Sequence, residues 1–199
     1  MDGAQKMIAT TRELIYEHGI ASAQTRAIAR ACHQSSAAPS YYFGTKARLL
    51  GEVLRADSNQ RLDVLRATLT PANSYDELVQ ATARTMAAFL QERRMRGTHE
   101  LMAEITRLSL ENRELADVRA QIRRNYRDSL ARLLRDKERA DIVRLPADPT
   151  VVAALLIALA QGLAVEATAD PGWDHAETVE MTVIPIRALL GGPADSNRR

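Results

Sequence analysis

The basic residues near the N-terminus are the part of this sequence best suited to do chemistry. No Asp or Glu occurs in residues 18–51, and the same window contains Arg26, Arg30, Lys46 and Arg48. Surface helices usually carry charges of both signs, so an acid-free basic window predicts contact with a polyanion, and nucleic acid is the first candidate. The alternative is a chance cluster of charges on a solvated face, and charge alone does not separate the two.

Residues that could support catalysis or bind a metal form no recognised pattern. The sequence has no Gly-x-Ser-x-Gly, no phosphate loop that ends in Gly-Lys-Ser/Thr and no Gly-x-Gly-x-x-Gly. The four histidines are dispersed, and the single cysteine, Cys32, excludes a disulfide framework and a cysteine-based zinc site. Glu100 and Glu104 lie one helical turn apart, but such pairs usually belong to a solvated face. We therefore expect no enzyme activity, no metal and no cofactor, and a helical enzyme is the weakest hypothesis.

Composition indicates the class of fold that must position the basic window. The 199 residues are 46% hydrophobic and 26% charged with a net charge of +2, which is the balance of a soluble globular protein. Only 9 Gly and 7 Pro occur, which favours helices over turn-rich β architectures. The start of the chain lacks an apolar stretch, and the longest apolar run, in residues 151–165, is shorter than the roughly 20 residues of a transmembrane helix. We expect an all-α, cytoplasmic protein without membrane contact, in which this run forms a buried core helix.

Helix-start and helix-stop residues divide the chain into about nine helices and no strands. The predicted helices cover about residues 2–18, 23–31, 37–43, 46–69, 75–94, 98–110, 113–139, 149–168 and 174–190. The predicted cap residues are Ser36 before Pro39, Thr45, Ser74 with Glu77, Asp148 before Pro149, and Asp174 with Glu177.

The first three predicted helices coincide with the basic window. The second and third are joined by a tight polar turn at residues 33–36, which is the plan of a helix-turn-helix. A recognition helix presents its N-terminal residues to base edges in the major groove, while basic and hydroxyl side chains around it contact phosphates. The residues predicted to contact DNA are Thr25, Arg26, Gln34, Ser35, Ser36, Ala37, Ser40, Tyr41, Tyr42 and Lys46.

The side-chain types of the residues predicted to contact DNA suggest a role for each. Ala37 or Ala38 could meet a thymine methyl group, and Gln34 could pair with adenine. Lys46 lies in the first turn of a helix and is predicted to bind phosphate, while Thr25 and Arg26 are predicted to clamp the DNA backbone. The alternatives are that Arg26 is only solvated and that at least one of the two tyrosines packs in the core.

The N-terminal quarter of the chain resembles the DNA-binding domain of the tetracycline-repressor (TetR) family of bacterial regulators. The resemblance covers about residues 7–50, and residues 158–163 with Asp170-Pro171 form a weaker C-terminal echo. It rests on Leu14-Ile15, Gly19, Arg26, Ile28-Ala29, Ser35, Tyr41-Tyr42-Phe43, Gly44-Thr45-Lys46 and Leu49-Leu50. The family often has Ala-Gly where this chain has Cys32-His33, glycine at the place of Ala37 and tyrosine at the place of Ser40, which indicates a subgroup.

The domains expected are a helix-turn-helix domain in residues 1–50, a ligand-binding and dimerisation bundle in residues 51–192 and a disordered tail in residues 193–199. The resemblance implies that the bundle encloses a pocket for an effector, and its lining implies an apolar or amphipathic one. The candidate pocket residues are Leu65, Met86, Phe89, Leu101, Met102, Ile105, Tyr126 and Leu130. A set of Met and aromatic residues at helical spacing is more often plain core, and this alternative stays open.

The helix predicted over residues 149–168 is apolar on nearly all sides, which exceeds the stripe that one core can cover. One of its faces is therefore predicted to meet a second copy of the chain, together with the last helix, as the resemblance also implies. The predicted interface residues are Leu155, Ala158, Gly162, Val165, Val179, Val183 and Ile186.

The leading hypothesis is a homodimeric transcription regulator, a repressor that binds a palindromic operator in double-stranded DNA and leaves it when a small effector binds. The alternative is a helical small-molecule-binding or scaffold protein without sequence-specific DNA binding. The overlap of the helix-turn-helix pattern with the basic window favours the regulator.

Overall fold

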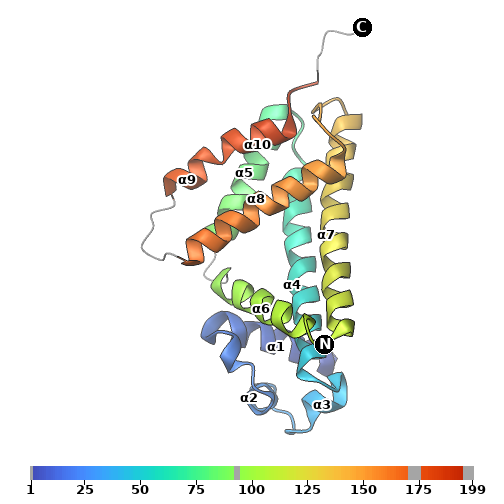
Figure 1. Cartoon of the computed structure of the whole chain (residues 1–199), viewed down its shortest axis with the longest axis vertical. Coiled ribbons are helices and arrows are strands. Elements are labelled where there is room, and N and C mark those ends of the chain that lie inside the picture. Colours follow the sequence, from blue (N-terminus) through green and yellow to red (C-terminus); the bar gives the residue numbers. More distant parts are fainter. Residues whose placement is uncertain (1, 92–94, 170–175, 195–199) are drawn as a thin grey trace. The chain divides into compact units, whose positions relative to one another are not determined.

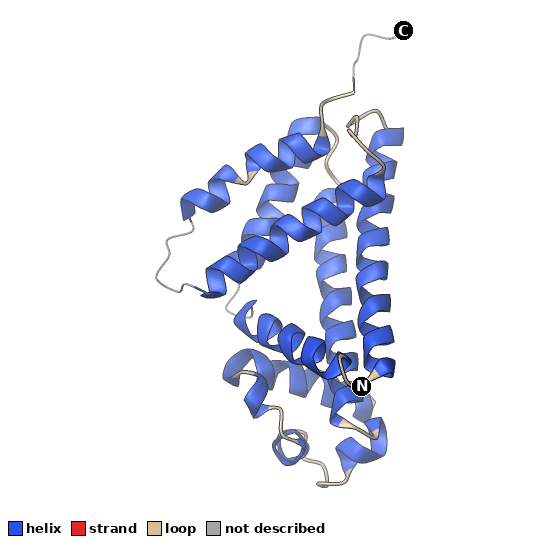
Figure 2. Cartoon of the chain, in the orientation of Figure 1, coloured by secondary structure: helices blue, strands red, loops and turns tan. Residues whose placement is uncertain are grey.

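A computed structural model of the chain describes residues 2–91, 95–169 and 176–194. This part of the chain is helical, and its one β-type pairing is an isolated bridge between Arg144 and Gly192 (Figure 2). The helices are α1 (Gly3–His18), the 3-10 turn η1 (Ile20–Ser22), α2 (Thr25–Ala31), α3 (Ala38–Phe43), α4 (Lys46–Leu69), α5 (Tyr75–Gln91), α6 (Met95–Ser109), α7 (Arg113–Arg139), α8 (Pro149–Ala169), α9 (Ala176–Met181) and α10 (Val183–Leu190). The all-α prediction is confirmed.

The chain divides into two compact units, whose helices are labelled in Figure 1. The first consists of residues 1–60 and 93–123, and the second of residues 61–92 and 124–199. The long helices α4 and α7 contribute residues to both units. The segment predicted to bind DNA, residues 1–50, lies within the first unit, which also contains α6.

The first unit has its own apolar core. Helix α1 packs against α2, η1 and α6, and α2 packs against α3. The buried residues at its centre are Met7, Ile15, Ala23, Ile28, Cys32, Ala38, Leu49, Leu50, Val53, Leu54, Leu101, Ile105, Leu115 and Ile122. Helices α2 and α3 have 7 and 6 residues, which is too short for a stable isolated helix. They depend on this core, because burial of one large aliphatic side chain contributes about 1.5–3 kcal/mol to stability.

The second unit packs α5 against α8, α9 and α10. Its core is formed by Leu62, Leu65, Leu69, Leu78, Val79, Met86, Leu130, Leu134, Val143, Val152, Leu156, Ile186 and Leu190, with smaller residues between them. A buried lysine stabilises the loop between α4 and α5. Lys137 Nζ donates to the carbonyls of Thr70 and Ala72, at 2.6 Å each. Burial lowers the pKa of Lys137.

Three of the predicted helix caps are confirmed. Thr45 Oγ1 accepts from the Arg48 amide at 3.2 Å, Ser74 Oγ accepts from the Glu77 amide at 3.3 Å, and Asp148 Oδ1 accepts from the Thr150 amide at 2.8 Å. The cap at Asp174 and the Asp170-Pro171 pair lie outside the described residues.

The single last helix predicted over residues 174–190 is wrong. Helix α9 ends at Met181 and α10 begins at Val183, with a turn at Thr182 between them. The reason is Pro185, which has no N–H to donate to the Met181 carbonyl four residues earlier. Beyond α10, Gly192 bonds back to Arg144.

Helix α8 is less buried than a core helix. Val152, Ala153 and Leu156 are buried, whereas Val151 and Leu155 are 50% and 48% exposed. The expected core helix is therefore buried along one side only: one side of α8 packs on α5 and α10, and the other, which includes the predicted interface residue Leu155, faces outward. Within the described residues, α8 alone is long and apolar enough to cross a membrane by length and composition, which is weak evidence for a membrane span.

Candidate nucleic-acid interface

The turn between α2 and α3 is held by two consecutive backbone amides. The His33 N–H donates to the Arg30 carbonyl at 3.0 Å, and the Gln34 N–H donates to the Ala29 carbonyl at 2.9 Å. This is the Schellman arrangement, which places His33 in the left-handed region with a φ of 56°. Glycine is the usual residue at such a position because a Cβ strains it. The turn is therefore fixed by hydrogen bonds although no glycine marks it in the sequence.

Helix α3 buries one side and exposes another. Ala38 and Pro39 are buried, whereas Ala37, Ser40 and Tyr41 are exposed. Residues three and four positions apart lie on the same face of a helix, so the exposed three form one surface. Of the two alanines predicted to meet a thymine methyl group, Ala37 is accessible. Ala38 is not, because its side chain packs in the core of the first unit.

The predicted cap of α3 by Ser36 is wrong. The cap residue is Ala37, and no side chain caps this helix. A capping hydroxyl normally accepts from the second or third helical amide, and the second position of α3 is Pro39, which has no amide hydrogen. Instead, the Ala38 N–H donates to the Ser35 carbonyl at 3.0 Å. The hydroxyl of Ser36 is consequently not used for capping, and the residue is exposed.

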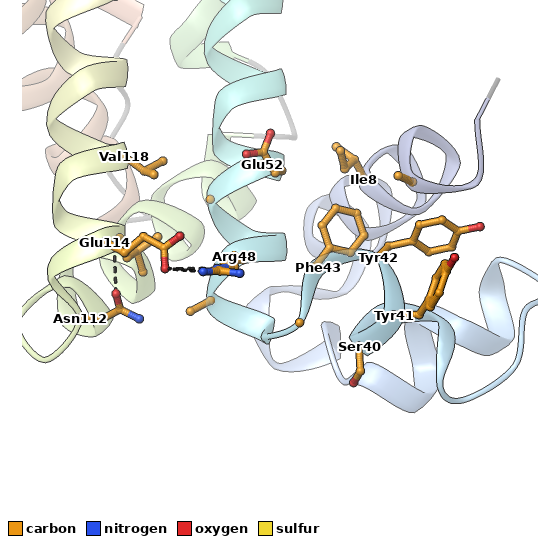
Figure 3. Close-up of a pocket in the computed structure, with 15 residues that line it drawn as sticks. Ile8, Ser40, Tyr41, Tyr42, Phe43, Arg48, Glu52, Asn112, Glu114 and Val118 are labelled. Carbon is orange, nitrogen blue, oxygen red and sulfur yellow. Dashed lines mark hydrogen bonds and ion pairs between the residues drawn. The ribbon is translucent and has the colours of Figure 1, made fainter.

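The two tyrosines of α3 differ in their surroundings. Tyr41 is 83% exposed and Tyr42 39% exposed, and their rings meet edge to face with centroids 5.2 Å apart (Figure 3). The Tyr42 hydroxyl lies against Gly3 at the start of α1, so closely that a Cβ on Gly3 would clash with it. Tyr42 therefore packs on α1, and Tyr41 is the tyrosine that is available to a partner.

The basic residues around the turn are exposed and unpaired. Arg26, Arg30 and Lys46 have no ion-pair partner among the described residues, and all three are exposed. Arg48 differs, because its Nε and Nη2 donate to one carboxylate oxygen of Glu114 at 3.1 and 2.9 Å. The acid-free window therefore contains three cations that can reach an anion, while the fourth is held by the first turn of α7.

The position of Lys46 suits a phosphate contact. Lys46 is the first residue of α4, where the amides of the first turn have no helical partners and the helix dipole is positive. Its field reaches α6, where it contributes to lowering the pKa of Glu104; the larger cause is the hydrogen bond from Arg107. The Arg107 side chain donates to both carboxylate oxygens of Glu104 at 2.9 Å. Lys46 itself forms no ion pair there.

A cleft of about 730 Å³ lies beside α3. Its wall contains Ile8, Phe43, Leu115 and Val118, and the pair Arg48–Glu114 lies at its edge. Figure 3 shows the rings of α3 on one side of this cleft and the start of α7 on the other. Asn112 Oδ1 accepts from the Leu115 amide at 3.0 Å and so caps α7 at this place.

The ten residues predicted to contact DNA all lie in the first unit. Nine are exposed, and Thr25 is half-buried. The structure brings them onto α2, the turn, α3 and the start of α4, which are consecutive in the chain. Their contact with DNA stays a prediction. The structure adds that nine of these ten side chains are accessible to a partner.

Sequence reasoning missed the contacts between α6 and α1. The carboxylate of Glu100 accepts from the Ile20 amide at 2.8 Å, although the two residues lie 80 positions apart. A Cβ on Gly97 would lie 2.9 Å from both the Ile15 carbonyl oxygen and Tyr16 Cα, so α6 approaches the backbone of α1 closely. The Tyr16 hydroxyl also donates to Asp57 of α4. The sequence pattern places Gly97 between the helices predicted over residues 75–94 and 98–110 and contains no signal of this contact.

The predicted pocket residues do not form one cluster. Leu65, Met86 and Leu130 are buried in the core of the second unit with Tyr126 at its margin, and Arg61 lies over the ring of Phe89 at 5.0 Å. The remaining three, Leu101, Ile105 and Met102, belong to the core of the first unit. A shared pocket stays a prediction.

The predicted dimer residues differ in accessibility. Leu155, Ala158, Gly162 and Val165 of α8 are exposed, and Val183 is half-buried. Ile186 is fully buried among residues of its own chain and therefore stabilises the second unit itself. The side chain of Val179 lies outside the described residues. Two further apolar side chains, Met181 and Ile184, are 52% and 60% exposed.

No group of three potential metal-ligating side chains occurs among the described residues. Cys32 is a free, buried thiol in the core of the first unit.

Fold and site together define a helix-turn-helix DNA-binding protein with a helical body. The family described as bacterial regulatory proteins, tetR family, matches residues 7–53, and the family described as BetI-type transcriptional repressor, C-terminal, matches residues 76–191. The second match alone covers more than half of the chain. The chain belongs to the TetR family and is a DNA-binding transcription regulator. The resemblance drawn from residues 7–50 is thereby confirmed.

Solved structures share this fold. A transcriptional regulator from Rhodococcus sp. Rha1 is 24% identical with a TM-score of 0.73, and the alignment covers 96% of this chain and 98% of that one. A TetR transcription regulator from Haloarcula marismortui is 19% identical with a TM-score of 0.74 and coverages of 95% and 98%. A regulator from Saccharomonospora viridis, solved in complex with choline, is 18% identical with a TM-score of 0.71 and coverages of 93% and 95%. No curated protein matches the chain.

Proposed function

We propose that this regulator is a homodimeric repressor that binds a palindromic operator in the cytoplasm through residues of α2, α3 and the start of α4. The observation that carries the proposal is the exposed side of α3, with Ala37, Ser40 and Tyr41. Beside it lie three exposed cations that have no ion-pair partner in the part of the chain that the structure describes. A helix-turn-helix places this side of its second helix in the major groove. The surrounding cations then meet the phosphates on either side of the groove.

The cations Arg26, Arg30 and Lys46 supply the sequence-independent part of the affinity. Each phosphate contact releases condensed counterions, so the binding constant falls with salt by a slope of about 0.9 per contact. Since none of the three is held by a carboxylate in the described part of the chain, none has to break an ion pair before it binds DNA. We expect a strongly salt-dependent affinity.

The half-exposed apolar residues of α8 support the dimer. A monomer would leave Val151, Leu155 and Val165 in water, and contiguous apolar surface of this kind usually marks a protein interface. A two-fold dimer would present two copies of α3, which fit half-sites about 34–36 Å apart or at a wider spacing. The palindromic operator follows from this symmetry.

The proposed effector is a small apolar or amphipathic molecule that binds in the helical body. All eight candidate pocket residues are aliphatic, aromatic or Met side chains, which suit such a ligand. An effector releases the operator when it binds more tightly to a conformation whose two recognition helices no longer match the half-sites. Choline, bound by the related protein from Saccharomonospora viridis, is one compound to test.

The test is a titration of the full chain against the DNA upstream of its own gene, measured by fluorescence anisotropy at several salt concentrations. The proposal predicts one tight, sequence-dependent complex with two subunits per site, and weaker binding to a shuffled duplex of the same composition. Equal affinity for both duplexes at low salt would contradict it and would favour the helical scaffold without sequence-specific binding.

A further inference from the structure

The side of α3 that faces the groove in the proposed complex lacks the chemistry that reads G·C pairs. We infer that the operator bases beneath α3 are A·T pairs, recognised through the methyl groups of their thymines. This inference rests on the proposed function and adds the class of base pair that the regulator selects. It follows from which side chains are exposed on α3 and the preceding turn, and from which side chain types are missing there.

Charged side chains are absent from the whole recognition segment. Residues 33–43, from the turn to the end of α3, contain no Arg, Lys, Asp or Glu. The exposed residues of this segment offer an imidazole, an amide, three hydroxyls, a methyl group and two phenol rings. They are His33, Gln34, Ser35, Ser36, Ala37, Ser40, Tyr41 and Tyr42.

The side chains that pair specifically with a G·C pair in the major groove are charged. Arg or Lys donates to guanine O6 and N7, and Asp or Glu accepts from cytosine N4. The nearest cations, Arg26, Arg30 and Lys46, lie on α2 and α4, outside this segment, where a helix-turn-helix meets the DNA backbone. Arg48 is held by Glu114 of α7. Neither half of a G·C pair therefore has its specific partner on the reading side.

The same surface suits an A·T pair. The methyl of Ala37 and the ring of Tyr41, which is 83% exposed, provide apolar contact for a thymine C5-methyl group. Gln34 offers the amide that pairs with adenine N6 and N7. The serine hydroxyls donate or accept and so discriminate weakly. Because Ala38 and Pro39 are buried, Ala37 supplies the apolar contact at the start of α3.

Two experiments test the inference with the full-length chain. Selection from random duplexes gives the consensus half-site, and each thymine of that site is then replaced by deoxyuridine, which lacks only the methyl group. The inference predicts a half-site whose conserved positions are mainly A·T pairs. Loss of a contacted methyl group should weaken binding about fourfold, the factor that corresponds to one buried methyl group. This substitution changes the DNA alone, so protein folding cannot cause the effect.

Protein variants connect the effect to α3. In Ala37→Gly or Tyr41→Ala, the deoxyuridine penalty should disappear at the contacted thymine, and both side chains are exposed, so helicity by circular dichroism should be unchanged. The control Lys46→Ala should weaken every duplex and keep the penalty.

The possible failures are distinguishable. Conserved G·C pairs in the half-site, or no penalty at any thymine, would overturn the inference and leave DNA binding intact. No enrichment of any sequence would overturn both the inference and the proposed function.

Discussion

In the proposed complex, affinity and base preference depend on different side chains of the helix-turn-helix domain. We propose that Lys46 brings a charge to the phosphates, whereas Gln34 brings an amide to a base edge. Replacement of Lys46 by alanine should weaken binding to all duplexes and reduce the salt slope by about one unit. Gln34→Ala should instead relax the preference at one base pair, by about 1–3 kcal/mol, and leave the salt slope unchanged. Anisotropy titrations of both variants at four salt concentrations measure the two effects.

A charge-matched control separates phosphate contact from net charge. Arg139 at the end of α7 is exposed and, within the described ranges, pairs with Asp136 alone, at 3.5 Å. Arg139→Ala therefore removes the same charge outside the helix-turn-helix domain. Its salt slope should equal that of the unmodified chain. A uniform loss of affinity in the Gln34 variant would mean that Gln34 does not read a base.

His33 holds a backbone conformation that favours glycine. Its φ is 56°, and Asp141 at the corresponding position after α7 has a φ of 53°. Both residues complete a Schellman pattern of hydrogen bonds, since the Ile142 N–H donates to the Lys137 carbonyl at 3.0 Å. Glycine would remove the strain of the Cβ, which exceeds the entropy that glycine adds to the unfolded chain. His33→Gly and Asp141→Gly should each raise the free energy of unfolding by about 0.5–1 kcal/mol, measured by urea denaturation.

The neighbouring substitution provides the comparison. Gln34 does not have a positive φ, so Gln34→Gly adds the same unfolded-state entropy without relief of strain and should lower stability. Equal effects of the glycine substitutions at positions 33 and 34 would refute the argument from strain.

At the level of elements, predictability follows from the range of the interaction. Caps such as Thr45 and Asp148 act within one turn, so the local pattern located the starts of α4 and α8. The turn before α3 and helix α3 itself were likewise predicted, because turn polarity and helix-start residues are local properties. Ser36 failed as a cap because the Ala38 amide donates to the Ser35 carbonyl and Pro39, the next residue, has no amide hydrogen. The contact of Glu100 with the Ile20 amide joins elements far apart in the chain, and no local pattern contains that information.

The close approach of α6 to α1 leads to a prediction about Gly97. Alanine raises helix propensity by about 1 kcal/mol, but its Cβ would lie 2.9 Å from backbone atoms of Ile15 and Tyr16. Backbone cannot rotate away as a side chain can, and overpacking of this kind costs about 1–3 kcal/mol. Gly97→Ala should therefore lower the free energy of unfolding in urea, despite the gain in propensity.

A second variant separates sterics from polarity at the same contact. Glu100→Gln keeps an oxygen that can accept from the Ile20 amide, so it should perturb α1 less than Glu100→Ala. A Gly97→Ala variant more stable than the original chain would show that α6 can move away from α1 without cost.

The cap of α8 makes stability depend on pH. The Asp148 carboxylate accepts from the Thr150 backbone amide, which lowers the pKa of Asp148. A carboxyl whose pKa is lower in the folded state stabilises the fold fully above its unfolded-state value of about 3.9, and this contribution is lost as pH falls through the folded-state value. Asp148→Asn keeps an accepting oxygen but no charge. The Tm advantage of the original chain over Asp148→Asn should therefore be present at pH 7 and vanish in strong acid, as scanning calorimetry can measure.

At the scale of the molecule, the exposed apolar surface of the second unit is the observation that supports the proposed dimer. Core residues such as Leu156 and Ile186 are satisfied within the chain, whereas Leu155 and Val165 remain 48% and 55% exposed. The sequence predicted Ile186 as an interface residue. Periodicity identifies an apolar face of a helix, but it does not show whether the same chain or a second copy covers that face. Only the packing of α10 against α5 and α8 shows that this side chain is already covered.

The dimer can be tested with a pair of matched charge insertions. Leu155→Glu with Val165→Glu would bury two carboxylates without partners in the proposed interface, which is too costly for the subunits to stay associated. Val64→Glu is the control, because Val64 of α4 is also exposed, at 42%, but lies outside that surface. Sedimentation velocity should show a monomer for the α8 variant and a dimer for the control, each with unchanged helicity. Because a monomer contacts one half-site at a time, the α8 variant should also lose most of its affinity for the full operator while it still binds an isolated half-site weakly. A dimeric α8 variant would place the interface elsewhere on the chain.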